Sequence, residues 1–210
     1  MSHIETTMNG LQVSRTRKRL RVSRMFGLSL LALPLFGAST WSSPTLFFGP
    51  LLFLTGVLLA VTGFCGRLWC LSYVAGRKKR VLVTAGPYSL CRHPLYLFSL
   101  IGGLGLCLCT RTLSAAVLFA LAFAVYYPRA IRGEEAFLSD NFPDYEEYRR
   151  RVPRFVPRWS NFIAGDGSVS VCDFGRELVP AAGFLLLIGV FEMLDSLHAA
   201  NLLPTWFLVP

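Results

Sequence analysis

Four long stretches without a charged residue constrain the fold of this chain more than any other feature. They are Met25–Trp41, Thr45–Gly66, Pro94–Thr110 and Thr112–Pro128, and their lengths are 17, 22, 17 and 17 residues. A helix that crosses the hydrocarbon core of a membrane needs about 17–25 residues. A chain of 210 residues is too small to enclose four helices that are apolar on every face. The sequence therefore predicts an all-α fold, a polytopic integral membrane bundle of four to five spans.

A fifth apolar stretch, Leu178–Phe191, has 14 residues before Glu192 interrupts it. It is a further span if it continues to about His198, or else a segment that lies in the membrane interface. Glu192, Asp195 and His198 recur every three residues at its far end. Acids inside a span are functional candidates by default, but their position favours a simple exit into the outer interface.

The positions of the basic residues predict the orientation of the spans. The net charge is +9, with 21 lysines and arginines in total. Twenty of these cations lie before the first span, between the second and third, or after the fourth, and only Arg111 lies on the opposite side. This distribution predicts that the N-terminus and both large polar segments are cytoplasmic. Anionic lipid headgroups suit these cations as partners, so the basic charge does not require nucleic acid.

The chain is predicted to have three parts. They are a basic cytoplasmic segment, a membrane core and a C-terminal extension, at 1–24, 25–157 and 158–210. The core holds spans at about 25–41, 45–66, 94–110 and 112–128, followed by a cytoplasmic helical lid at 129–157. In the lid we expect a helix from Ile131 to about Asp140, a break at 141–143, and a second helix from Pro143 to about Arg151. The extension combines a linker with the fifth apolar stretch. Small residues in the second and third spans, such as Gly63 and Gly102, allow either close helix packing or close approach of a ligand to the backbone.

Polar and aromatic residues converge at the predicted cytoplasmic mouth of the bundle. Gly86-Pro87 predicts a tight turn, and His93 follows it where the third span begins. The flanking rings of Tyr88 and Tyr96 suit a cationic ligand. Glu134 and Glu135 follow Arg129 and Arg132 at the end of the fourth span, where one acid can face inward while the other stays solvated. The simpler alternative is that these side chains only anchor helix ends in the interface. No metal-ligand cluster, glycine-rich phosphate loop or Ser-His-Asp set is recognised.

At these residues the sequence resembles the isoprenylcysteine carboxyl methyltransferase and phospholipid methyltransferase superfamily. The first shared motif is Gly86-Pro87-Tyr88 followed by Arg92-His93-Pro94-Leu95-Tyr96. The second runs from Glu134-Glu135 through Phe142, Tyr145 and Tyr148 to Val152-Pro153-Arg154-Phe155-Val156-Pro157. The resemblance covers about 47–157. Pro143 stands where the family usually has glycine, and the part after Pro157 has no counterpart in the minimal family core.

The resemblance implies an S-adenosylmethionine-dependent methyltransferase whose two cytoplasmic segments fold over the cofactor. The implied cofactor-binding residues are Tyr88, Arg92, His93, Tyr96, Leu97, Glu134 and Glu135. The implied catalytic residues are Arg129, Arg132 and Glu135, with Arg129 or Arg132 near the cofactor or an acidic group of the substrate. No metal is implied. The implied partners are the membrane and a lipid or lipid-like substrate, without nucleic acid, and the oligomeric state is not predicted.

The predicted function is methyl transfer to a membrane-associated acceptor at the cytoplasmic membrane surface. The acceptor is a lipid, a lipid-modified cysteine carboxylate or a small amphiphile, and the sequence does not choose among them. One alternative is an NADPH-dependent membrane reductase of the steroid-reductase type, although adjacent glutamates would repel the phosphates of NADPH. The other alternative is a non-catalytic membrane scaffold.

Overall fold

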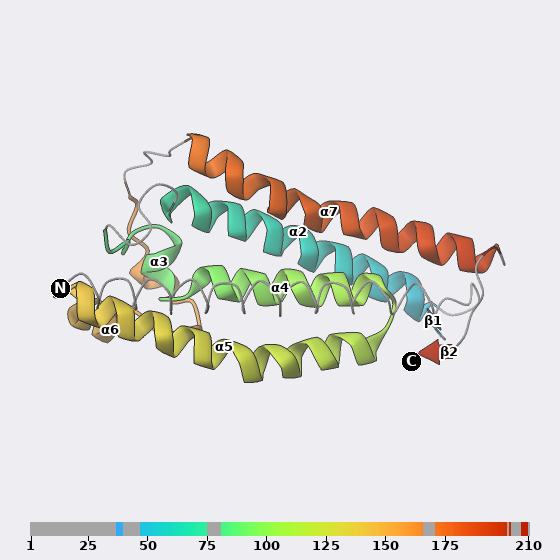
Figure 1. Ribbon diagram of the computed structural model, residues 1–210, viewed down its shortest axis with the longest axis horizontal. Coiled ribbons are helices and arrows are strands. Elements are labelled where there is room, and N and C mark those ends of the chain that lie inside the picture. Colours follow the sequence, from blue (N-terminus) through green and yellow to red (C-terminus); the bar gives the residue numbers. More distant parts are fainter. Residues whose placement is uncertain are drawn as a thin grey trace, which may run out of the picture.

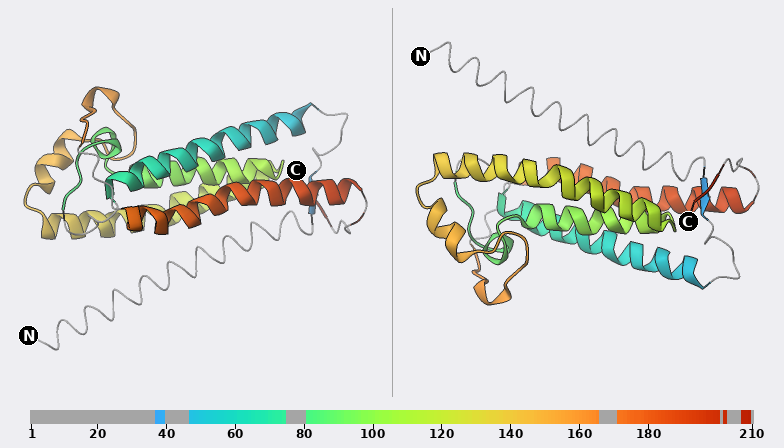
Figure 2. Two further views of the ribbon diagram at one scale, coloured as in Figure 1. Left: turned by 90° about the horizontal axis from the view of Figure 1, so that it is seen from above. Right: turned by 90° about the horizontal axis from the view of Figure 1, so that it is seen from below.

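The computed structural model describes residues 37–39, 47–74, 81–165, 171–200, 202 and 207–209. Its elements are β1 (Gly37–Ser39), α2 (Phe48–Val74), α3 (Pro87–Leu90), α4 (Pro94–Cys109), α5 (Leu113–Asn141), α6 (Tyr145–Arg151), η1 (Trp159–Asn161), α7 (Val171–Ala199) and β2 (Phe207–Val209). The four long helices α2, α4, α5 and α7 form an elongated bundle (Figure 1). We call the end of the bundle that carries α3 and α6 the lid end. The opposite end, where α4 connects to α5, is the turn end. Both ends are also visible from above and below (Figure 2).

Glycines set the tight contact between α2 and α4. A Cβ atom on Gly63 would lie 2.4 Å from the backbone nitrogen of Gly102. A Cβ atom on Gly105 would lie 2.3 Å from the backbone nitrogen of Ala60. Only small residues permit helices to approach this closely. The predicted close packing of these two helices is confirmed.

The α5 helix differs from the prediction for the lid. It is continuous over 29 residues and contains Pro128, so the separate helix predicted from Ile131 does not exist. Proline is tolerated inside membrane helices where neighbouring groups can satisfy the freed carbonyl, and Gly133 is the only glycine or proline between Pro128 and Pro143. The predicted break is confirmed around Phe142, but α6 begins at Tyr145 and not at Pro143.

Two further boundaries depart from the sequence prediction. The α2 helix continues eight residues beyond the predicted end at Gly66, because Arg67 to Val74 contains no glycine or proline. Most of the predicted first span lies outside the described residues. Its residues Gly37–Ser39 form β1, which pairs in parallel with β2, so a helix through this end of the span is wrong. Apart from this strand pair, the regular structure of the described chain is helical.

Within the residues that the structure describes, two helices are long and apolar enough to cross a membrane, namely α2 and α5. Only 22% of the most apolar 18-residue window of each is buried within the protein. Exposed side chains of α5 include Val117, Leu121 and Val125. A large exposed apolar surface on a helix of this length is suited to lipid and not to water. The structure therefore supports a membrane protein, while four to five spans stay a prediction; α4 is apolar but has 16 residues.

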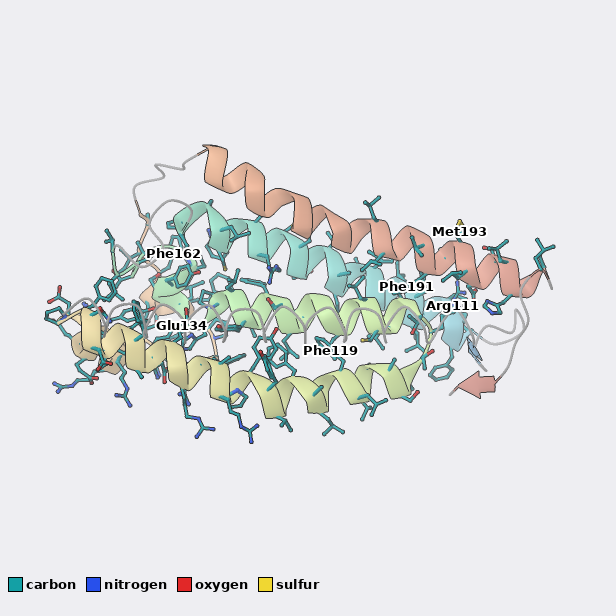
Figure 3. All side chains as sticks on the ribbon, in the orientation of Figure 1. Arg111, Phe119, Glu134, Phe162, Phe191 and Met193 are labelled. Atoms are coloured by element: carbon teal, nitrogen blue, oxygen red, sulfur yellow. The ribbon has the colours of Figure 1, made fainter. Side chains whose placement is uncertain are left out.

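The C-terminal extension forms one long helix, α7, packed along α2 and α4. Phe191 is buried with Leu106 of α4 in the half nearer the turn end. Arg111 of the turn pairs with Glu192 at 3.3 Å and also with Asp195. These ion pairs tie α7 to the connection between α4 and α5 at the turn end (Figure 3), and the predicted exit of this end into the outer interface stays a prediction.

Candidate functional site

The site begins at the turn that precedes α3. Gly86 has a φ of 61°, in the left-handed region where a residue with a side chain is strained. A Cβ atom at this position would also lie 2.4 Å from the ring of Tyr73. Pro87 occupies the first position of α3, and the hydroxyl of Ser89 donates to the carbonyl of Gly86 at 2.6 Å. The tight turn predicted at Gly86-Pro87 is confirmed.

A second segment, Pro153–Ile163, lies along this turn, and we call it the strap. Backbone N–H groups bond the two segments at three points: Arg92 to the carbonyl of Pro153 at 2.9 Å, Arg158 to that of Leu90 at 3.0 Å, and Gly86 to that of Ile163 at 2.7 Å. The backbone of Ile163 also donates to the hydroxyl of the buried Ser89 at 3.0 Å. Because both segments satisfy each other's backbone groups, the strap fixes the position of Arg92 and His93.

The α6 helix holds the strap against α5. Tyr145, Tyr148 and Val152 lie on one face and are buried together, and Leu138 of α5 packs against them. The hydroxyl of Tyr148 donates to the carbonyl of Tyr88 at 2.7 Å. This packing and the hydrogen bond of Tyr148 bring the end of α5 to the Gly86 turn.

Glu135 of α5 is the centre of the polar cluster that results. Its Oε1 atom accepts from Arg92 at 2.8 Å, from His93 Nε2 at 3.1 Å and from Arg154 Nε at 3.2 Å. Arg154 bonds the second carboxylate oxygen as well. The side chains of His93 and Glu135 are 3% and 13% exposed, so water does not compete strongly for these bonds. The cluster links α5, the start of α4 and the strap.

The protonation states follow from burial and from these neighbours. Burial lowers the pKa of His93 below its ordinary value, despite its hydrogen bond to Glu135. Burial alone would raise the pKa of Glu135, but the hydrogen bonds from Arg154 and His93 and the charge of Arg92 leave it lowered. At neutral pH a neutral imidazole therefore faces a carboxylate, and the Nε2 atom of His93 carries the proton that it donates.

Glu134 differs sharply from its neighbour. Its side chain is exposed, and it forms no hydrogen bond or ion pair with any residue that the structure describes. Its charge nevertheless lies close enough to act on His93 and Tyr88. Figure 3 shows Glu134 near the lid end of α5, beside the Gly86 turn. One glutamate thus faces into the protein and is fully engaged, while the other is open to a ligand.

Aromatic rings connect this cluster to the apolar part of the bundle. The rings of His93 and Tyr96 have centroids 5.8 Å apart, and Tyr96 meets Tyr127 of α5 edge-on at 5.2 Å. Tyr127 in turn stacks on Phe123 at 3.6 Å. The faces of such rings attract cations.

The remaining predicted residues lie elsewhere. Arg129 and Arg132 are exposed and donate to carbonyls of their own helix, at 2.8 Å to Val125 and at 3.2 Å to Pro128. The structure does not bring either arginine to Glu135. Leu97 is half-buried in the first turn of α4. Sequence reasoning assigned no role to Arg154, although the motif Val152–Pro157 contained it.

A cavity of about 320 Å³ lies beside the Gly86 turn at the lid end. Its described lining residues are Tyr73, Val81, Leu82, Val83, Thr84, Ala85, Ala164 and Gly165. None of the predicted cofactor-binding residues is among them. In the described part of the chain, no group of three or more His, Cys, Asp or Glu side chains could hold a metal ion.

Comparison with known proteins identifies the class to which this arrangement belongs. The phospholipid methyltransferase family matches residues 44–145. The chain is also 37% identical over 81 residues to the protein-S-isoprenylcysteine O-methyltransferase of Schizosaccharomyces pombe, covering 38% of this chain and 34% of that one. No solved structure matches the chain. The chain belongs to the isoprenylcysteine carboxyl methyltransferase and phospholipid methyltransferase superfamily, as its motifs predicted.

Two bacterial relatives match nearly the whole length. The cobalt-zinc-cadmium resistance protein CzcN of Cupriavidus metallidurans is 43% identical over 203 residues, covering 96% of this chain and 93% of that protein. The nickel-cobalt-cadmium resistance protein NccN of Alcaligenes xylosoxydans xylosoxydans is 39% identical over 196 residues, covering 93% and 91%. Matches of this length include most of the part after Pro157, so the sequence that forms α7 is matched in these relatives.

Proposed function

We propose that this protein transfers a methyl group from S-adenosylmethionine to a membrane-associated acceptor at the lid end. The acceptor would be a lipid, a lipid-modified cysteine carboxylate or a small amphiphile. The observation that carries the proposal is the pairing of two adjacent glutamates with different roles. Glu135 is fully bonded by Arg92, His93 and Arg154, while Glu134 beside it is exposed and open to a ligand.

The residues around Glu134 suit the chemistry of the cofactor. A carboxylate can hold the ammonium group of its methionine part, and a nearby guanidinium can hold the carboxylate. Arg92 and Arg154 supply such guanidinium groups, and the rings of His93 and Tyr96 offer faces to a positive sulfonium. When bound, the cofactor supplies a methyl group that is already activated by its positive sulfur. These residues therefore fit the cofactor.

The task left to the protein is to position groups and exclude water. Glu135 acts as a positioning residue, because its bonds fix Arg92 and His93. His93 is neutral and already donates its proton to Glu135, so we assign it to the pocket wall and not to proton transfer. A carboxylate, thiolate or phosphate acceptor needs no strong base. Arg129 and Arg132, exposed where α5 leaves its apolar half, are available for an acidic group of the acceptor.

We further propose a multi-pass topology with the N-terminus and the lid in the cytoplasm. The support is the distribution of cations, 20 of 21 on one side of the predicted spans. A soluble cofactor would then reach the lid end from the cytoplasm, and the acceptor would arrive through the membrane. Labelling of cysteines introduced at 140–160 tests this orientation, and reaction with an impermeant reagent from outside would contradict it.

The names of the two bacterial relatives suggest a biological role. We propose that methyl transfer by this chain contributes to resistance to divalent metals such as cobalt, zinc and cadmium. Growth of a sensitive deletion strain on these metals tests the link. Wild type should restore growth, and Glu134→Gln should restore it much less at equal protein levels. Equal rescue by wild type and Glu134→Gln would show that metal resistance does not depend on the proposed site.

The direct test measures transfer of a labelled methyl group to membrane lipids. Membranes that contain the protein are incubated with S-adenosylmethionine labelled in its methyl group, and the extracted lipids are separated and counted. We expect a labelled lipid that depends on the wild-type protein and is at least about tenfold weaker with Glu134→Gln, since a charge-assisted bond is involved. Asp140→Asn removes an exposed acid of the same helix and should leave labelling unchanged. Labelling that Glu134→Gln leaves intact would contradict the site.

A further inference from the structure

Arg67 is a charged residue in an apolar place, and its role is not explained by the site described above. It is the only charged residue of α2, and it lies seven residues before the end of that helix. Its NH1 group donates to the hydroxyl of Ser99 on α4. Ser99 follows His93 by six residues, so this contact lies about 9 Å further into the bundle than the imidazole.

Among α2, α4 and the apolar half of α5, no carboxylate compensates the charge of Arg67. The α4 helix and the apolar half of α5 contain no acidic residue, and neither does α2 itself. The Nε atom of Arg67 is buried and has no hydrogen-bond partner among the described residues. An ionised side chain inside a membrane segment is costly, and such residues usually mark a path or a binding site for a substrate.

Three helices contribute side chains around this guanidinium. Arg67 comes from α2, its hydrogen-bond partner Ser99 comes from α4, and Tyr127 comes from α5. The charge of Arg67 lies close enough to act on the hydroxyl of Tyr127. Tyr96 meets Tyr127 edge-on and also contacts His93, so the same rings connect Arg67 to the lid-end cluster.

We propose that Arg67 binds the anionic head of the membrane-dissolved acceptor, a carboxylate or phosphate carried on an alkyl chain. The guanidinium offers several donors to such a group, and Ser99 uses only one of them. The tail would lie among apolar side chains of the bundle, and the head would lie beneath the cluster of Glu135. This inference rests on the proposed function, and it makes Arg67 the residue that selects an anionic acceptor over an amine.

The chemistry of transfer is consistent with this role. A lone pair of the acceptor oxygen forms the new oxygen–carbon bond, while the bond from methyl to sulfur breaks and its electron pair stays on sulfur. No proton moves. The acceptor loses one negative charge in the step, so the ester interacts less strongly with Arg67 than the acceptor did. Weaker binding of the product would favour its release into the membrane.

Binding of simple amphiphiles tests the assignment without turnover. Dodecyl phosphate and dodecanoate are titrated into wild type, Arg67→Gln, Arg67→Lys and Ser99→Ala in dodecyl maltoside micelles, with dodecyltrimethylammonium as the cationic control. Arg150→Gln, which removes an exposed charge of α6, controls for general attraction to a basic protein. The two anions distinguish a phosphate from a carboxylate head. S-Adenosylhomocysteine affinity and thermal stability are measured on each variant.

We expect Arg67→Gln to weaken anion binding by at least tenfold, while its stability and S-adenosylhomocysteine affinity stay near wild type. Ser99→Ala, Arg67→Lys and Arg150→Gln should keep most of the anion affinity. Unchanged anion binding in Arg67→Gln would overturn the proposal. The proposal would also be overturned if Arg67→Gln and Ser99→Ala both lost anion binding and thermal stability together. Arg67 would then serve only to hold α2 to α4. Wild type that binds the anion but not S-adenosylhomocysteine would instead contradict the proposed methyl transfer.

Discussion

The different environments of Glu134 and Glu135 predict that the same substitution has very unequal effects on stability at two adjacent positions. Glu135→Gln keeps the size of the side chain but removes the charge that three neighbours share. Arg92, whose side chain is 12% exposed, would be left as a mostly buried cation without its counterion. Arg154 is 47% exposed, so hydration by water would replace most of the interaction energy that it loses. The substitution should therefore destabilise the fold mainly through Arg92.

The magnitude follows from these exposures. Removing one partner of a buried ion pair costs about 3–5 kcal/mol, whereas a surface pair is worth about 0–1 kcal/mol. The Arg92 pair is close to the first case, so we expect a loss of about 2–4 kcal/mol for Glu135→Gln. At about 2–4 °C per kcal/mol for a chain of this size, Tm should fall by roughly 4–16 °C. Glu134→Gln changes an exposed side chain and should stay within about 0.5 kcal/mol of wild type.

Buried thiols provide the assay. Cys91 and Cys107 are free and buried, so unfolding in detergent exposes them to a dye that fluoresces on reaction with thiols. Burial also raises the pKa of Cys91 to about 11, which keeps its background reaction slow in the folded protein. Glu135→Gln should shift the transition clearly and Glu134→Gln should not. Equal Tm values for the two variants would refute the assignment of Glu135 as the inward glutamate.

Three further predictions follow from single contacts. Gly86→Ala forces a side chain into a left-handed turn against Tyr73 and should cost roughly 1–3 kcal/mol in thermal unfolding; an unchanged Tm would contradict the strain. The folded pKa of His93 lies below its unfolded value of about 6.5, so its contribution to stability is complete above that value and is lost as pH falls from there through the lower folded pKa. His93→Gln should therefore flatten the fall in stability between about pH 7.5 and pH 5, and equal slopes for the two proteins would refute this. Arg111→Gln breaks the ties to α7 and should lower Tm without changing S-adenosylhomocysteine affinity, whereas a parallel loss of affinity would show that α7 shapes the site.

Much of the helical core follows from the lengths of the uncharged stretches, but the helix ends do not. The uncharged stretches 94–110 and 112–128 contain α4 and the apolar half of α5. A run of this length without charge is stable mainly as a helix in a membrane or a protein core. Arg67 appeared to end the second span, yet α2 passes through it, since a long side chain can find a polar partner on a neighbouring helix. Pro128 did not end α5 for the related reason that packing overrides local propensity.

The sequence motifs indicated which residues form the candidate site, but not how their side chains are arranged. The motifs predicted that Arg92, His93 and Glu135 belong to one site, and the structure joins them by hydrogen bonds. Which glutamate faces inward depends on how α5 is rotated about its own axis. The sequence of two adjacent acids does not indicate that rotation. Arg154 reaches Glu135 only because the strap folds back along the Gly86 turn, and that contact depends on backbone bonds far apart in the sequence.

Calorimetric titration of detergent-solubilised protein with S-adenosylhomocysteine and with NADPH tests the central claim most directly. We predict that S-adenosylhomocysteine binds, that NADPH does not, and that Glu134→Gln weakens the binding at least about tenfold, as expected for a lost charge-assisted bond. Asp140→Asn, the matched change at an exposed acid of the same helix, should leave the affinity unchanged. Binding of NADPH in place of S-adenosylhomocysteine would identify a reductase. S-Adenosylhomocysteine binding that is indifferent to Glu134→Gln would contradict the assignment of the site.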